Sequence, residues 1–149
     1  MMPSITIQRT TEEHALEIAR CLDFDTLETE RIMGTDPMDS LVNSQTLWYG
    51  DVPLCSFDII KPTDECGASA WLMMTNHVKE QHVARQFIEV LGESLAAAVD
   101  EYGRIGGVAW IRGGAPKMLQ VIGATFMATA HPSFLAWSLV DNYKLRRFA

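Results

Sequence analysis

Hydrophobic residues alternate with polar ones, or form short apolar runs, in several stretches that turn residues separate. This pattern predicts β-strands at residues 5–8, 46–49, 54–60, 68–75, 105–111, 125–130 and 134–140. The stretch 68–75 contains the unbroken run Trp71-Leu72-Met73-Met74, which is typical of a central strand. The segment Gly50-Asp51-Val52-Pro53 has the composition of a hairpin turn.

Other segments repeat their apolar residues every three to four positions, which predicts helices. Thr10 and Glu13 form a capping-box pattern before a short amphipathic stretch that ends near Leu22. One or two short helices are expected between residues 23 and 44, with a stop at Gly34 and a restart at Asp36-Pro37. A further short helix is expected at 116–122, with Gly123 as its stop.

The strongest helical pattern covers residues 78–102 and ends at Gly103, a residue suited to the position after a helix. Six of its apolar residues should face a sheet: Ala84, Phe87, Ile88, Leu91, Leu95 and Val99. The predicted order is β-α-α-β-β-β-α-β-α-β-β. This is an α/β (α+β) domain with a mixed sheet of about six to seven strands and about four flanking helices.

Composition narrows the class of protein. The 149 residues are 48% hydrophobic, which suits a single domain over 1–149 with a basic tail at about 142–149. The net charge of −7 argues against a nucleic-acid-coating protein, and no apolar run is long enough to span a membrane. Three cysteines without a CxxC pair, and His77 and His82 five positions apart, suggest neither a disulfide nor a metal site.

The order of elements resembles the GNAT acetyltransferase fold, and the segment 115–124 adds to the likeness. It resembles the family motif N-x-x-A-x-x-L-Y-x-K-x-G-F. Ala115 and Gly123 match that motif and Met118 fits its Leu, whereas Arg112 replaces its Asn and Leu119 replaces its Tyr. The resemblance implies that acyl-CoA lies in a gap between the strands at 68–75 and 105–111.

Four segments resemble the short GNAT-like proteins of T7-like podophages: 71–76, 101–103, 108–111 and 119–126. That resemblance implies a role in virion and internal core morphogenesis. It implies protein partners, either phage structural proteins or host proteins, with a homo-oligomer left open. It places the protein in the host cell cytoplasm and in the virion, without a membrane.

In the GNAT family a loop of the form Q/R-x-x-G-x-G/A holds the CoA pyrophosphate with backbone N–H groups. The matching stretch, 76–86, contains no glycine, and Gln81-x-x-Ala84 is its nearest equivalent. One interpretation is a degraded CoA cradle assisted by Lys79 or Arg85, and the other is an ordinary helix start. The residues implied to contact the cofactor are Met74, Asn76, Lys79, Gln81, Ala84, Arg112, Gly113 and Gly114.

The motif departures favour a degenerate site. Glu80 would repel a pyrophosphate, Leu119 cannot protonate a leaving thiolate, and the strand at 68–75 has no carboxylate to act as a base. No catalytic residue is assigned, no cofactor is expected, and the chain is expected to act through protein contacts. Enzymatic activity is left open. The alternative is an N-acetyltransferase that uses acetyl-CoA.

Overall fold

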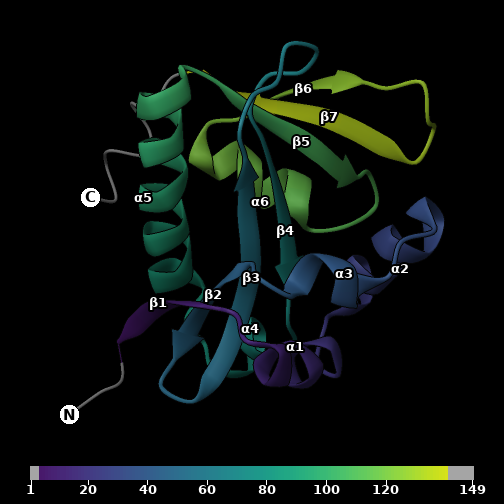
Figure 1. Cartoon of the computed structure of the whole chain (residues 1–149). Helices are drawn as coiled ribbons and strands as arrows, with labels where there is room; N and C mark the ends of the chain where they lie inside the picture. The colour runs from purple at the N-terminus through teal and green to yellow at the C-terminus, as the bar shows by residue number, and fades with distance from the viewer. Residues whose placement is uncertain (1–3, 141–149) are drawn as a thin grey trace. The chain divides into compact units, whose positions relative to one another are not determined.

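The computed structural model describes residues 4–140, and the predicted basic tail lies outside this range. The described elements are β1 (Ile5–Arg9), α1 (Glu12–Ala19), α2 (Phe24–Met33), α3 (Pro37–Leu41), β2 (Gln45–Tyr49), β3 (Val52–Ile60), β4 (Ser69–Met74), α4 (His77–Glu80), α5 (Ala84–Tyr102), β5 (Ile105–Trp110), α6 (Ala115–Ile122), β6 (Thr125–Ala128) and β7 (Phe134–Leu139) (Figure 1). The seven strands have the order β1-β2-β3-β4-β5-β7-β6. The predicted α/β class and mixed sheet are confirmed, because β4 and β5 run parallel whereas β1–β2, β2–β3, β5–β7 and β6–β7 are antiparallel.

The chain divides into two compact units. The first combines the residues up to 58 with 72–87, and the second combines 59–71 with the residues from 88 onward. In the first unit the β2–β3 hairpin turns at Gly50, which has a φ of 60°. The predicted turn was too long, since Val52 and Pro53 already pair in β3.

A chain of buried hydroxyl groups links β1, β2 and β3 in the first unit. The Oγ–Oγ distances are 2.9 Å from Ser44 to Thr10, 2.6 Å from Thr10 to Thr46 and 2.7 Å from Thr46 to Ser56. Ser44 donates its proton to the carbonyl of Leu41 at 2.8 Å. Since each hydroxyl has one proton, Ser44 accepts from Thr10, Thr10 from Thr46, and Thr46 from Ser56.

This chain explains why one predicted helix cap is wrong. The Thr10 side chain is buried in the hydroxyl chain, so the next residue, Thr11, caps α1 by accepting from the His14 N–H. The predicted stop and restart are confirmed: Gly34 ends α2 with a φ of 70°, and Asp36 caps α3.

The predicted helix over 78–102 is wrong at its start, because residues 81–83 interrupt it and form a break between α4 and α5. His82 in this break has a φ of 53°, which no α-helix accommodates. Ala84 is exposed and therefore does not face a sheet. Phe87, Leu91 and Leu95 are at most 1% exposed and Val99 is 5% exposed, as expected of a core-facing stripe. Ile88 is only half-buried.

In the second unit β5 pairs with β7 in a regular antiparallel ladder, and α6 packs on β5. A Cβ atom at Gly107 would lie 2.6 Å from the Ala70 carbonyl oxygen and 2.8 Å from Trp137 Nε1. Only glycine fits this position, because the β4 backbone and the indole approach from two sides. Within residues 4–140, no helix is both long enough and apolar enough to cross a bilayer.

Candidate functional site

Strand β4 is one of the two strands between which the GNAT resemblance implies that acyl-CoA lies. The start of α2 holds Met74, the last residue of β4. The Met74 N–H donates to Thr26 Oγ1 at 3.0 Å, and the Met74 carbonyl accepts from the Asp23 N–H at 2.8 Å. Leu22 and Thr75 form an antiparallel bridge next to these bonds. Both backbone groups of Met74 therefore have protein partners.

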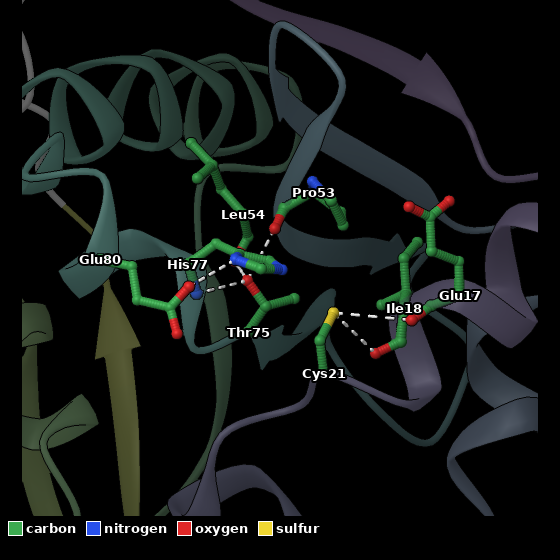
Figure 2. A network of polar contacts seen from close by, with 8 residues as sticks. All are labelled: Glu17, Ile18, Cys21, Pro53, Leu54, Thr75, His77 and Glu80. Carbon is green, nitrogen blue, oxygen red and sulfur yellow. Dashed lines mark hydrogen bonds and ion pairs between the residues drawn. The ribbon is translucent and has the colours of Figure 1, made fainter.

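The Thr75 side chain, between β4 and α4, makes two hydrogen bonds to β3 and one to α4 (Figure 2). Its buried hydroxyl donates a shared hydrogen bond to two carbonyl oxygens, that of Pro53 at 2.7 Å and that of Leu54 at 3.1 Å. The same oxygen accepts from the His77 N–H at 3.2 Å. Thr75 thus fixes the first residue of α4 to β3.

His77 and Glu80 form a pair one helical turn apart (Figure 2). His77 Nδ1 lies 2.8 Å from Glu80 Oε2, and the two side chains are 30% and 57% exposed. The carboxylate orients the imidazole and leaves Nε2 for another partner. An oriented imidazole directly after β4 is a candidate proton acceptor.

Cys21 lies close to this pair, but its thiol is not activated. Its Sγ donates to the carbonyls of Ile18 at 3.4 Å and Glu17 at 3.5 Å (Figure 2). Burial raises the pKa of the Cys21 thiol, and the negative charges of Glu17 and Glu80 raise it further. A nucleophilic role is therefore disfavoured, since the thiolate is the reactive form.

The stretch 76–86, which the sequence compares with a pyrophosphate loop, spans α4, the break at 81–83 and the first residues of α5. The Gln81 N–H donates to the His77 carbonyl at 2.9 Å, which closes α4. The Phe87 N–H donates to the Val83 carbonyl at 2.8 Å, so α5 begins with Ala84 and Val83 is its cap. A valine side chain cannot accept from the first amides of the helix, which have no acceptor within the helix itself. Gln81 and Ala84 therefore flank a helix start.

Asp23 and Lys79 add opposite charges near the end of β4. Asp23 Oδ1 accepts from the Thr26 N–H at 2.8 Å and caps α2. Burial raises the pKa of the Asp23 carboxyl, whereas the positive charge of Lys79 lowers it. Of the predicted cofactor contacts, Met74, Asn76, Lys79, Gln81 and Ala84 all lie in this part of the first unit.

The other predicted contacts, Arg112, Gly113 and Gly114, lie in the second unit, in the turn between β5 and α6. Gly114 precedes α6, where the Met118 N–H donates to its carbonyl at 3.2 Å. Arg112 is exposed, whereas Leu119 is 1% exposed. Leu119 therefore belongs to the core, and its side chain has no polar group to offer a ligand.

Sequence reasoning missed two features of this region. His77 and Glu80 are three positions apart, a spacing that could have indicated a helical pair. The bonds from Asp23 and Thr26 to Met74 had no local signal. Within residues 4–140, no three His, Cys, Asp or Glu side chains are placed to hold a metal ion, and the three cysteines are free thiols.

Comparison with known proteins gives a consistent result for the fold. No family profile matches the chain, and no curated protein matches it significantly. Solved structures do match: the GNAT domain of S. lividans PAT has a TM-score of 0.67 at 12% identity, over 89% of this chain and 88% of that one. An acetyltransferase from Thermus thermophilus has a TM-score of 0.62 at 16% identity, over 93% of this chain and 99% of that one. An aminoglycoside N(6')acetyltransferase from Legionella pneumophila has a TM-score of 0.60 at 11% identity, over 100% of this chain and 98% of that one. At these identities the likeness shows the GNAT fold alone.

Proposed function

We propose that this chain binds acyl-CoA, with the pyrophosphate at the start of α5, and transfers the acyl group to an amine. The observation that carries this proposal is the break between α4 and α5. A continuous helix over 78–102 would have no helix start near Ala84. The break gives a 19-residue helix with a new start at Ala84.

A helix start favours an anion through its N–H groups and its dipole. Lys79 and Arg85 are exposed on either side of the break and would add positive charge. The Glu80 carboxylate, which the sequence suggested as a source of repulsion, keeps its negative charge and is bonded to His77 Nδ1 at 2.8 Å. The helix start and the two cations are the features that support anion binding by a loop without glycine.

His77 is the candidate for proton transfer. In the proposed reaction the amine nitrogen attacks the thioester carbonyl, the carbon–sulfur bond breaks and CoA leaves as a thiolate. The thiolate then takes up, through solvent, the second proton that the nitrogen loses as it becomes an amide. The attacking ammonium must first lose a proton, and His77 Nε2 would accept it while Glu80 holds the ring. Acetyl-CoA is the expected cofactor of this reaction.

Calorimetry with acetyl-CoA tests the binding step, and Gln86→Glu is the informative variant. A carboxylate in the first turn should stabilise the free helix, yet repel the pyrophosphate and weaken acetyl-CoA binding about tenfold. Binding of acetyl-pantetheine, which has no pyrophosphate, should not change. Gln120→Glu, an exposed position on α6, is the matched control.

Transfer is tested by CoA release in the presence of a panel of primary amines, followed by chromatography. His77→Asn should lower the rate of release while the affinity for acetyl-CoA stays the same. If wild-type protein gives no heat with acetyl-CoA up to millimolar concentration, the proposal is wrong.

A second candidate function is the one that the phage resemblance implies: a protein with a degenerate site that acts by protein contact in internal core assembly or host control. Two observations favour it. The Met74 N–H is bonded to Thr26 Oγ1 and cannot polarise an acyl carbonyl. The motif position for a proton-donating Tyr is the buried Leu119. Absence of acetyl-CoA binding would support this candidate.

A further inference from the structure

The α2 helix has one buried residue among its ten. Thr26 is its buried residue, whereas Phe24 is 67% exposed and Leu27 is 47% exposed. Helices of globular proteins normally direct their large apolar residues to the core, because that burial stabilises them. The exposed apolar residues of α2 therefore point to a partner.

Phe24 and Leu27 lie three positions apart and so share one face of the helix. The first turn of α2 is fixed, since Asp23 and Thr26 bond to both backbone groups of Met74. Arg31, one turn beyond Leu27, is held by Glu28 through two hydrogen bonds of 2.9 Å. The face is thus presented on an anchored helix, and its arginine is already neutralised.

The surroundings of this face are acidic. Residues 23–39 contain six Asp and Glu residues against Arg31, a net charge of −5 out of −7 for the whole chain. Burial raises the pKa of the Glu30 carboxyl, and the nearby charge of Asp36 raises it further. Such mutual repulsion is relieved by a cation.

We propose that the face formed by Phe24 and Leu27 docks a basic amphipathic segment of a partner protein. Apolar side chains of that segment would cover the two residues, and the net charge of −5 over 23–39 would attract its Lys and Arg side chains. A second copy of this chain does not fit, because two segments of charge −5 would meet. An anionic lipid surface is excluded by the same repulsion. The inference is independent of acyl transfer.

The test uses a fluorescein-labelled amphipathic Leu/Lys peptide of about 18 residues, followed by fluorescence anisotropy. Binding should weaken at least about fivefold between about 50 mM and about 300 mM NaCl, because salt screens the charges. Phe24→Ala with Leu27→Ala should weaken binding about tenfold. Leu16→Ala with Val121→Ala, at positions that are 50% and 51% exposed, is the matched control and should change it less than about twofold.

A charge variant gives a second, independent measurement. Asp25→Asn with Glu30→Gln should reduce the salt dependence while leaving the fold intact by circular dichroism. The proposal is overturned if the Phe24/Leu27 variant binds like wild type, if the control variant loses as much, or if a Leu/Glu peptide binds equally well. It is also overturned if sedimentation shows a dimer that the Phe24/Leu27 variant abolishes.

Discussion

Gly107→Ala is the substitution for which the structure gives the sharpest expectation. The added Cβ would lie 2.6 Å from the Ala70 carbonyl oxygen, 2.8 Å from Trp137 Nε1 and 2.9 Å from Trp137 Cε2. These distances are shorter than any relaxed contact of a methyl group. Neither neighbour can move easily, because one is strand backbone and the other is an indole only 3% exposed.

Overpacking of this kind costs about 3 kcal/mol of unfolding free energy, at the upper end of the usual range. For a chain of 149 residues that corresponds to a fall of roughly 10 °C in the melting temperature. Thermal unfolding followed by circular dichroism measures it. Urea unfolding should show a lower midpoint with an unchanged m value.

Alanine substitutions at Gly106 and Gly67 are the controls for Gly107→Ala. A Cβ at Gly106 would lie 3.0 Å from the Trp137 carbonyl oxygen, so Gly106→Ala should cost about 1 kcal/mol. A Cβ at Gly67 would meet nothing within 4 Å, so Gly67→Ala should be neutral or stabilise by about 0.5 kcal/mol. The reasoning is refuted if Gly107→Ala melts within about 2 °C of Gly67→Ala.

Thr46→Val should lower the unfolding free energy in urea by about 2 kcal/mol, because the Ser56 hydroxyl proton loses its buried acceptor. Ser56→Ala should lower it by about 1 kcal/mol less than Thr46→Val does, because Thr46 still donates to Thr10. Equal costs would contradict the assigned direction of the hydroxyl chain. Asp23→Asn should become more stable relative to wild type as the pH rises. The pKa of the Asp23 carboxyl is raised in the folded protein, so the protonated carboxyl stabilises the wild-type fold at low pH. Wild type loses that stabilisation when the carboxyl ionises, whereas Asn has no proton to lose. Parallel stability–pH curves for the two proteins would argue against a raised pKa. Iodoacetamide should label the exposed Cys66 in the folded protein and Cys55 only after unfolding, because Cys55 is 0% exposed and burial raises the pKa of its thiol far above the ordinary range. Labelling of both thiols at one rate, measured by mass spectrometry, would be inconsistent with this core.

Much of the fold was predictable because local patterns determine it. The strand pattern, the Gly34 stop, the Asp36-Pro37 restart and the Gly123 end are all short-range signals, and the structure confirms them. The break at 81–83 was not predictable in this way. Lys79, Gln81 and His82 continue a helical sequence without a Gly or Pro, so nothing local indicates the positive φ of His82.

The candidate site was less predictable because its contacts join distant parts of the chain. Thr26 and Met74 are 48 positions apart, and no spacing rule connects them. The shift of the α1 cap from Thr10 to Thr11 has the same cause, since bonds to Ser44 and Thr46 compete for the Thr10 hydroxyl. Whether residues 84–86 hold a pyrophosphate stays a prediction.

The bonds from Asp23 and Thr26 to Met74 also constrain the order in which the polypeptide can acquire its structure. The first unit is discontinuous, since residues up to 58 need 72–87 to complete it. During synthesis α2 emerges long before Met74, so its anchoring must wait until Met74, 48 positions after Thr26, has left the ribosome. The closure entropy of such a loop is larger than that of a hairpin, and contacts of this range are associated with slow folding. The exposed apolar residues of α2 are consequently carried on an unanchored segment throughout the time that this part of the chain is being made.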